Sequence, residues 1–319
     1  MTTIFIYFAF VDISMAYIEK QRHGNKIYYY LVKSVRVSPT EVRKVRIFLG
    51  PKLPPHDTLQ KLFRELERKS PKRYPAKWLP KGILERVEDI RASVAAYHDF
   101  PNEVLPDDFL VRFTYNTNAI EGNPLTLRQT ALILSDKIAP QGAKTEDVVE
   151  VMNGMDAWTF VKGRKGLFSE AFLKSVQYEV TKNTLCRLQG KYRDSEVRIA
   201  GSEWKPPPAK QVASRVKEVV KEYRTLKRTL HPVELASWLH NKIAQVHPFT
   251  DGNGRTARLA MNWVLLRKRF PPVIIDVRNK EEYYRMIEAA DKGDQKPFAV
   301  FLARQLLEQY SVLAKEEKG

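Results

Sequence analysis

The chain is poor in cysteine and in long apolar runs. Its 319 residues include a single cysteine, Cys186, so no intramolecular disulfide can form and a reducing, cytoplasmic setting is expected. The most apolar stretch, IFIYFAFVDISMAY, is interrupted by Asp12 after too few residues to span a bilayer. It also lacks the basic start of a secretory signal, and Met15 offers an alternative start within it. We therefore expect no membrane association and no secretion.

Several common signatures of nucleotide and metal sites are also missing. The chain contains no G-x-x-x-x-G-K-[ST] P-loop and no H-E-x-x-H pair. The stretch that starts at Asp251 opens like a calcium loop, but Arg255, Thr256 and Asn262 occupy positions at which an EF-hand needs a ligand, a glycine and a glutamate. No helix-turn-helix pattern, RNP motif or zinc module is present either. These absences exclude the best-known routes to metal hydrolysis, P-loop chemistry and nucleic-acid recognition.

Acidic side chains are outnumbered by basic ones. The chain has 54 Lys and Arg against 37 Asp and Glu, which gives a formal net charge of +17. Such a balance favours an anionic partner, for which a nucleotide, a nucleic acid and an acidic protein surface are candidates. A solvated Lys-rich surface explains the charge equally well. Hydrophobic residues make up 43%, which is ordinary for a globular protein of one large or two modest domains.

The patterning predicts a mainly α fold preceded by an N-terminal antiparallel β segment. Residues 1–50 form this segment, with a hairpin at His23-Gly24-Asn25 and a third strand over 44–50. Residues 51–81 are basic and interrupted by prolines, which indicates a linker. Residues 82–319 show helical periodicity and form the main domain. Helical periodicity breaks at residues 190–208, where VRIA, Gly201 and Pro206–Pro208 predict a small hairpin.

The stretch VHPFTDGNGRTAR, residues 246–258, lies between two helical patterns. Pro248 disfavours helical geometry at His247, and Gly252 and Gly254 are free to adopt positive φ. A glycine-rich turn that leads into a helix N-terminus binds anions through its free N–H groups and the helix dipole. Taken alone, DGNG is a common turn and a His before Pro is more often structural than catalytic.

Other side chains of the same stretch fit phosphate chemistry. Arg255 and Arg258 are three residues apart on one helix face, and two guanidinium groups suit a polyphosphate. Asp251 next to them makes sense if it holds Mg²⁺ against the phosphates. His247, largely neutral near pH 7, can take a proton from an attacking hydroxyl. The residues point to phosphoryl or nucleotidyl transfer.

The segment HPFTDGNGRTAR resembles the signature H-P-F-x-[DE]-G-N-G-R-x-x-R of the Fic family at every specified position. The resemblance covers roughly residues 90–315 and implies an all-helical core whose flap, a β-hairpin at about 195–208, aligns the target segment. It also implies transfer of AMP from ATP to a Ser, Thr or Tyr hydroxyl of a protein, with Mg²⁺ or Mn²⁺ as cofactor. The family roles that carry over are a general base at His247, a metal ligand at Asp251, a packing residue at Phe249, and phosphate binding by Gly252, Asn253, Gly254, Arg255 and Arg258.

Two further segments resemble parts of the same family. TNAIEG, residues 117–122, resembles the inhibitory motif [ST]-x-x-x-E-[GN]. Thr117 and Glu121 are four apart at the end of a helix predicted over about 107–122, from which Glu121 would pair bidentately with Arg258 and displace the γ-phosphate. On its own, the hexapeptide is an ordinary helix C-terminus. Near residue 290, the resemblance implies adenosine contacts from Tyr284 and Asp291, where Asp291 replaces the Asn often present. Tyr283 and Tyr284 are equally well explained as core aromatics.

The sequence therefore supports two hypotheses of different classes. The first is an autoinhibited, Mg²⁺-dependent protein adenylyltransferase that acts on an unknown protein target, including itself, and that also removes AMP at the same site. The second is a nucleic-acid-associated regulator that uses the core as a nucleotide sensor, motivated by the charge and by ten Lys or Arg against four Asp or Glu over residues 41–74. The enzyme ranks well ahead, and nucleic acid is not the expected partner. The β segment is left with three roles: covering the core, dimerising through an edge, or recruiting the target.

Overall fold

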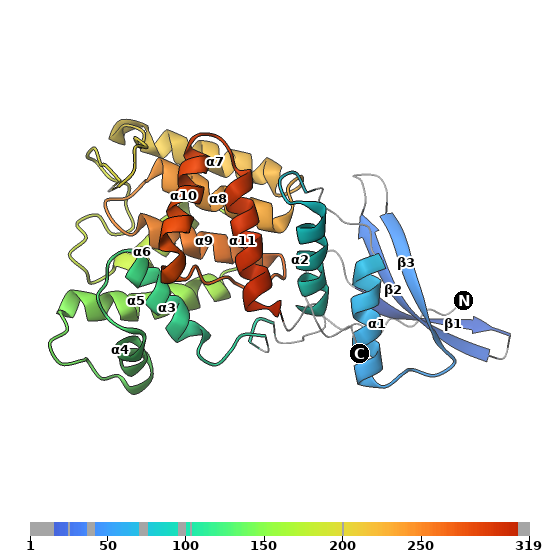
Figure 1. Ribbon diagram of the computed structural model, residues 1–319. Coiled ribbons are helices and arrows are strands. Elements are labelled where there is room, and N and C mark those ends of the chain that lie inside the picture. Colours follow the sequence, from blue (N-terminus) through green and yellow to red (C-terminus); the bar gives the residue numbers. More distant parts are fainter. Residues whose placement is uncertain are drawn as a thin grey trace.

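Figure 1 shows the computed structural model, in which a helical body is joined to a small β-sheet lobe. The structure describes residues 16–24, 26–36, 42–69, 76–94, 100–102, 104–199 and 201–311. The apolar N-terminal run with Asp12 and Met15 lies outside these ranges. Within them, no helix has both the length and the apolarity that crossing a bilayer requires.

The lobe is a three-stranded antiparallel sheet, as the sequence predicts. Its strands β1 (Ala16–His23), β2 (Lys26–Arg36) and β3 (Val42–Gly50) are hydrogen-bonded in the order β1-β2-β3. Gly24, with a φ of 59°, lies in the tight turn between β1 and β2. The register aligns Ile18, Leu31 and Ile47 on one face, which is the apolar face of the lobe.

Helix α1 (His56–Lys69) covers that apolar face and corrects the prediction of a linker over residues 51–81. Its apolar side chains at three- and four-residue spacing, from Leu59 through Leu62 and Phe63 to the fully buried Leu66, pack on the sheet. The prolines that suggested a linker stand before and after the helix rather than within it. The high density of basic residues obscured this short amphipathic pattern.

The helical body confirms the mainly α prediction. Its helices are α2 (Lys81–Val94), α3 (Phe109–Ile120), α4 (Leu127–Ala131) with the π-helical turn η1 (Leu132–Asp136), α5 (Thr145–Gly163), α6 (Glu170–Thr181), the 3-10 turn η2 (Ala209–Gln211), α7 (Val212–Leu226), α8 (Pro232–Val246), α9 (Asn253–Arg267), the 3-10 turn η3 (Val277–Asn279), α10 (Lys280–Asp291) and α11 (Lys296–Gln309).

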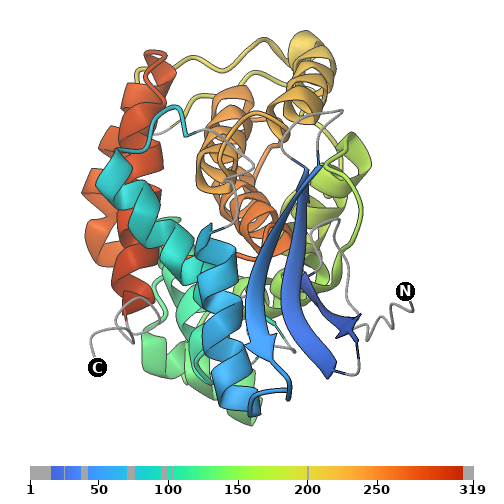
Figure 2. The same cartoon turned by 90° about the vertical axis from the view of Figure 1, so that its right-hand side faces the viewer.

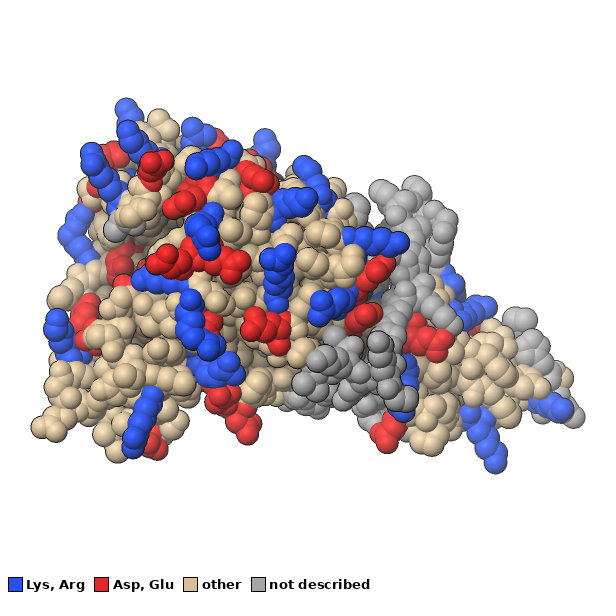
Figure 3. Space-filling view, in the orientation of Figure 1, with Lys and Arg blue, Asp and Glu red and all other residues tan. Residues whose placement is uncertain are grey.

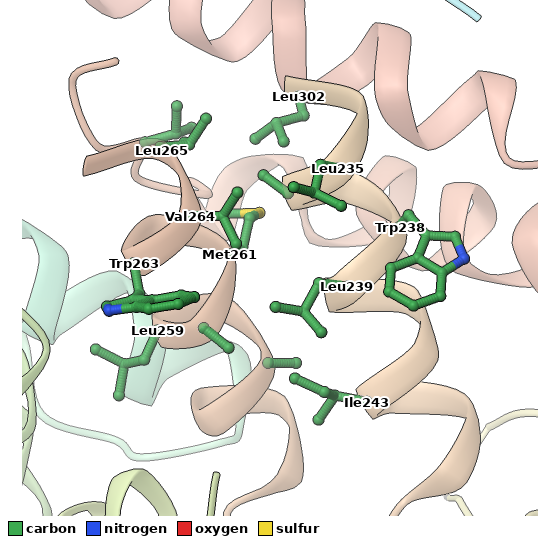
Figure 4. Packing of buried hydrophobic residues seen from close by; sticks show 14 of the residues in the cluster. Leu235, Trp238, Leu239, Ile243, Leu259, Met261, Trp263, Val264, Leu265 and Leu302 are labelled. Atoms are coloured by element: carbon green, nitrogen blue, oxygen red, sulfur yellow. The ribbon is translucent and has the colours of Figure 1, made fainter. Parts of the chain in front are cut away.

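Helices α8 and α9 form the centre of the body. Figure 4 shows Leu239 and Ile243 of α8 facing Met261 and Val264 of α9, with Leu302 of α11 closing one end. All five are at most 2% exposed. At roughly 1.5 to 3 kcal/mol per fully buried aliphatic side chain, this packing fixes the two helices relative to each other. The turn that joins them is the signature stretch, so the core holds the candidate site rigidly at one end of the helix pair.

The predicted flap differs from a regular hairpin. Residues 195–199 and 201–208, the described part of the predicted flap, contain no strand, although Gly201 turns the chain with a φ of 74°. Pro206, Pro207 and Pro208 lack the N–H groups that a ladder needs. The two arms are held instead by Arg193, whose guanidinium donates to the carbonyl oxygens of Ser195 and Pro207.

A buried carboxylate attaches the segment before α2 to the body. Glu234, in the first turn of α8, is fully buried and accepts hydrogen bonds from three successive backbone N–H groups, those of Lys77, Trp78 and Leu79. In this way one side chain satisfies three donors that precede a helix start. Helix α2, which leads from α1 and the sheet, is thereby fixed to α8.

Replacing Glu234 by alanine is expected to lower the free energy of unfolding by about 2 to 4 kcal/mol, because it leaves those N–H groups without a partner. The measurement is urea unfolding followed by circular dichroism. Glu234→Gln keeps one acceptor oxygen and should lose less, and Glu222→Ala on the exposed face of α7 should change the value by less than about 0.5 kcal/mol. Equal stability of Glu234→Ala and the wild type would show that the segment before α2 is held in another way.

Candidate active site

The signature stretch makes a turn between α8 and α9. His247 ends α8 in the left-handed region, with a φ of 47°, and Pro248 disfavours right-handed helical geometry at this residue. Gly252 has a φ of 76° and leads directly into α9. Gly254, predicted to have the same freedom, is instead in the first turn of α9. Its missing side chain makes room for Glu121, whose Cδ would lie 3.1 Å from an added Cβ.

The turn is held closed from inside. Asn253 accepts from the backbone N–H of Phe249 at 2.9 Å and donates to its carbonyl oxygen at 2.8 Å. Phe249 is fully buried and packs on Tyr192, with ring centroids 5.8 Å apart, which confirms it as a packing residue. Gln177 of α6 donates to the carbonyl oxygen of Asp251 at 3.1 Å. The side chain of Asn253, expected to belong to the anion site, therefore shapes the turn.

The first N–H groups of α9 have no side-chain cap. Gly252, at its N-cap, provides no side-chain acceptor for the first N–H groups of the helix. Those groups and the helix dipole favour negative charge at this end. In the structure the carboxylate of Glu121 lies beside Gly254 at this end of the helix. The geometry of the turn thus fits the expected anion site, and a side chain of the same chain already supplies a negative charge to it.

The imidazole of His247 is largely buried and has one hydrogen-bond partner. Its Nδ1 lies 3.4 Å from the carbonyl oxygen of Ala244, which can only accept, so the proton belongs on Nδ1 and the lone pair on Nε2. Burial, assisted by the positive charge of Arg193, lowers the pKa of His247 below its usual 6.5. The ring is therefore neutral near pH 7, and Nε2 has no hydrogen-bond partner among the described residues.

Glu121 contacts Arg258 as the inhibitory motif predicts, but in a different geometry. Arg258 Nη2 donates to Glu121 Oε1 at 2.7 Å, and this is a single bond rather than the expected bidentate pair. Thr117 accepts two further hydrogen bonds from the guanidinium: Arg258 Nε lies 2.8 Å from its hydroxyl oxygen, and Nη2 lies 2.8 Å from its carbonyl oxygen. Burial alone would raise the pKa of Glu121, yet the Arg258 guanidinium holds it below its usual value. The Glu121 side chain is therefore a carboxylate at neutral pH.

A chain of buried hydrogen bonds supports Arg258 from behind. His240 Nδ1 lies 3.1 Å from Asn241 Oδ1, so this nitrogen is the donor and His240 Nε2 accepts from the hydroxyl of Tyr283 at 2.7 Å. The Tyr283 oxygen in turn accepts from Arg258 Nη1 at 3.3 Å. Burial lowers the pKa of His240 to about 3, so the imidazole stays neutral and this donor pattern is preserved. Tyr283 is thereby a core aromatic that also positions Arg258.

Arg255 is held between two carboxylates. Its Nη1 donates to Glu150 Oε1 of α5 at 2.7 Å and its Nη2 to Asp251 Oδ2 at 3.1 Å. The other oxygen of Glu150 accepts from Asn123 at 2.9 Å, two residues after Glu121. Glu150 thus links the segment that carries Glu121 to the helix that carries both arginines.

The donor set around Asp251 suits a magnesium ion held mainly by phosphates. The Asp251 side chain is 52% exposed, and no group of three or more His, Cys, Asp or Glu side chains that could enclose a metal exists among the described residues. Mg²⁺ characteristically takes one or two carboxylates and completes its shell with substrate phosphates and water. A single accessible carboxylate beside an uncapped helix start matches that requirement.

Tyr284 and Asp291 of α10 lie in different surroundings. Tyr284 is 41% exposed and donates to the carbonyl oxygen of Ile120 at 3.3 Å, next to Glu121. Asp291 Oδ1 is buried without a hydrogen-bond partner, and burial raises the pKa of this carboxyl group. Both side chains therefore retain polar atoms that a ligand could engage. The hydroxyl group of the neighbouring Tyr283, in contrast, already donates to His240 and accepts from Arg258.

Arg193 connects the predicted flap to the signature stretch. Its Nε donates to the carbonyl oxygen of His247 at 2.8 Å, while its two Nη atoms hold the flap arms. At the flap's far side, Trp204 Nε1 donates to the carbonyl oxygen of Gln245 at 2.9 Å. The extended segment is thus fixed along the end of α8, beside His247.

Sequence reasoning missed four residues that build this site: Glu150, Gln177, Arg193 and His240. Each looks like an ordinary member of a helix face or a loop, and each meets its partner across a wide gap in sequence, as Glu150 does with Arg255 over 105 residues. The only local signal was a polar residue within an otherwise apolar helix, which is clearest at His240.

Comparison with known proteins places this site among relatives. Residues 167–265 match the Fic/DOC family. The curated Protein adenylyltransferase Fic of Nematostella vectensis is 32% identical over 236 residues, which is 72% of this chain and 55% of that protein. Its counterpart in Drosophila persimilis is 30% identical over 228 residues, 69% of this chain and 44% of that protein. The chain therefore spans about half the length of the curated relatives it matches.

Solved structures of Fic proteins are also similar to this chain. A fragment of Fic-1 from C. elegans has a TM-score of 0.65 at 29% identity, covering 73% of this chain and 71% of that one. A variant of that fragment has a TM-score of 0.64 at 30% identity, with 74% and 72% coverage. A Fic domain containing signaling protein from Bacteroides thetaiotaomicron has a TM-score of 0.65 at 25% identity, with 72% and 96% coverage.

Proposed function

The chain belongs to the Fic/DOC family, and from that premise we propose that it is a protein adenylyltransferase that is restrained by Glu121. It transfers AMP from ATP to a Ser, Thr or Tyr hydroxyl of a protein. One observation carries this proposal: the same turn holds His247, with its Nε2 atom available, and the uncapped start of α9. The curated relatives are protein adenylyltransferases, which supports the same reaction class.

The proposed reaction is a displacement at the α-phosphorus of ATP. The target hydroxyl oxygen forms a bond to that phosphorus, its proton passes to His247 Nε2, and the bond to the bridging oxygen breaks to release pyrophosphate. The backbone N–H groups at the start of α9 and the guanidinium groups of Arg255 and Arg258 stabilise the phosphate charge. Asp291, with its unpaired Oδ1, and Tyr284 are assigned to the adenosine.

Asp251 is assigned to Mg²⁺, or Mn²⁺ in its place, which supplies charge neutralisation to the phosphates when it is bound. Arg255 then exchanges Asp251 for phosphate while Glu150 keeps its guanidinium in place, because Glu150 holds the opposite nitrogen. The flap segment tied by Arg193 presents the target chain next to His247.

We assign Glu121 two roles: inhibition of AMP transfer and participation in AMP removal. Its carboxylate lies at the start of α9 and accepts one hydrogen bond from Arg258, so that it repels the phosphate that would bind there. We assign the same carboxylate a role in hydrolytic removal of AMP, in which it would orient a water that attacks the phosphorus and releases AMP from the modified hydroxyl. Self-modification is proposed as a consequence of releasing the brake.

Labelled ATP tests the proposal. The wild-type chain and Glu121→Gly are incubated with Mg²⁺, a cell extract and ATP that carries the label in either the α- or the γ-phosphate. Protein labelling is expected from the α-phosphate only, with release of pyrophosphate in equal amount. Labelling from the γ-phosphate would contradict AMP transfer and indicate a kinase, and absence of α-label in both proteins would also contradict it.

A further inference from the structure

The β-sheet lobe has a second face that the proposed enzyme does not use. Side chains alternate between the two faces of a strand. Because Ile18, Leu31 and Ile47 pack against α1, the opposite or outer face carries the residues next to them in sequence. The exposed part of this outer face follows β3 and the hairpin end of β2, and we define it as the outer patch: Lys26, Tyr28, Tyr30, Lys44, Arg46 and Phe48.

We propose that the outer patch binds a single-stranded nucleic acid, with a base on Phe48 and phosphates on the flanking cations. This inference stands apart from AMP transfer, because the outer patch and the signature turn belong to different lobes. Helix α1 lies between the sheet and α2 in Figure 1, and the 90° view of Figure 2 brings the sheet to the front of the molecule. The two activities are therefore separable by substitution.

Phe48 is the centre of the patch. This large apolar side chain is 57% exposed, although the lobe has an apolar face on which it could have been buried. It is held by two tyrosines, with ring centroids 5.2 Å from Tyr30 and 5.8 Å from Tyr28. An exposed aromatic ring on a sheet is the kind of surface on which unpaired bases stack, and each stacked base contributes to affinity regardless of its identity.

Cations lie on the same face on both sides of the aromatic cluster. Lys26 stands two residues before Tyr28 on β2, and Arg46 and Lys44 stand two and four residues before Phe48 on β3, all exposed. Arg46 makes one ion pair of 3.5 Å with Glu19, which also accepts from Gln21, and most of its N–H donors remain for another acceptor. Overall, the three strands carry eight Lys or Arg and one Glu.

This charge is more one-sided than that of the rest of the molecule. On the face of the helical body seen in Figure 3, Lys and Arg alternate with Asp and Glu, which is typical of a solvated surface. In the sheet, acidic partners are scarce. An acidic peptide would satisfy the cations but not the exposed ring, and the stacked bases of a duplex would not reach Phe48. A flexible strand with a polyanionic backbone and free bases satisfies both features.

The test uses fluorescence anisotropy with the full chain and labelled oligonucleotides of about 12 nucleotides, as DNA, as RNA and as a DNA duplex of the same sequence. We expect binding to single strands that weakens as salt is added. The logarithm of the binding constant should fall against the logarithm of salt concentration with a slope of about −2, because each of three neutralised phosphates contributes about −0.7. Phe48→Ala should weaken binding between about 5-fold and about 150-fold. The DNA and RNA arms identify which strand is preferred.

Matched variants separate the ring from the charge. Phe48→Tyr should restore binding and Phe48→Leu should not, because only the former keeps an aromatic face. Replacing Lys26, Lys44 and Arg46 together by alanine should reduce the salt slope by about 2, whereas Lys221→Ala, on an exposed position of α7, should leave it unchanged. All these side chains are exposed, and thermal unfolding should confirm that each variant is folded.

The outcomes are decisive in both directions. Single-strand binding that depends on Phe48 and on the three cations establishes the surface. No binding at low salt, binding that is unchanged in the Phe48→Leu and triple variants, or binding to the duplex alone would each overturn the proposal. Because AMP transfer in Phe48→Leu is expected to equal that of the wild type, failure here leaves the proposed enzyme untouched.

Discussion

Replacing His247 by alanine is expected to lower AMP transfer by about 100- to 10 000-fold, the range typical of losing a positioned general base. The substitution removes the only proton acceptor assigned to the target hydroxyl while leaving Arg258 and the start of α9 intact. Initial rates with α-labelled ATP should be measured in a Glu121→Gly background, where the starting rate is highest.

The matched readout for His247→Ala is ATP binding by calorimetry. Affinity should change less than about threefold, because the ring contacts no phosphate in the proposed arrangement. A rate loss of less than about tenfold would contradict a general base at this position. A parallel loss of rate and binding would indicate instead that His247 mainly shapes the turn, since it ends α8 with a positive φ.

The pH profile provides a second check on His247. The general base acts in its neutral form, and burial lowers the pKa of His247 below 6.5. The rate should therefore be constant from pH 8 to about pH 6.5 and should fall as the pH decreases through the lowered pKa. A rate that already falls between pH 8 and pH 7 would mean that another group controls the proton transfer.

Replacing Glu121 by glycine is expected to raise AMP transfer at low ATP concentrations by roughly 10- to 100-fold. The charge-assisted hydrogen bond between Glu121 and Arg258 is of a kind that contributes about 1.5 to 3 kcal/mol, and ATP must displace it. Arg258 itself should stay ordered without Glu121, because Thr117 and Tyr283 provide three other acceptors. The gain should therefore arise from access to the anion site.

Two controls make the Glu121 test specific. Glu121→Gln keeps the volume but removes the negative charge and should give an intermediate gain. Glu222→Gln, at an exposed position of α7, should have no effect. Equal rates in Glu121→Gly and the wild type, with ATP binding measured to be equally strong, would refute the brake. If His247→Ala abolishes the rate increase caused by Glu121→Gly, then Glu121 and His247 act on the same reaction at the same site.

The largest differences between sequence-based expectation and structure lie where contacts are remote. Glu121 and Arg258 form one hydrogen bond instead of two, and the guanidinium donates its other hydrogen bonds to Thr117 and Tyr283. Gly254 is helical, and its lack of a side chain leaves the space that Glu121 occupies. Neither feature has a signature within a few residues of the position concerned.

What the sequence alone determined is local. Gly24 turns the first hairpin, Pro248 ends α8 at His247, Gly252 starts α9, and Thr117 and Glu121 share one helix end. These features depend on φ preferences and on helical or strand periodicity, which act over a few residues.

Only the tertiary structure decided which charges meet. Glu121 reaches Arg258 across 137 residues, Glu150 reaches Arg255 across 105, and Glu234 gathers three N–H groups more than 150 residues away. In the same way, packing placed α1 on the sheet and left Phe48 in solvent on the other side. Burial makes such pairings necessary, since a buried charge needs a partner, but it does not encode the partner's identity in the neighbouring sequence.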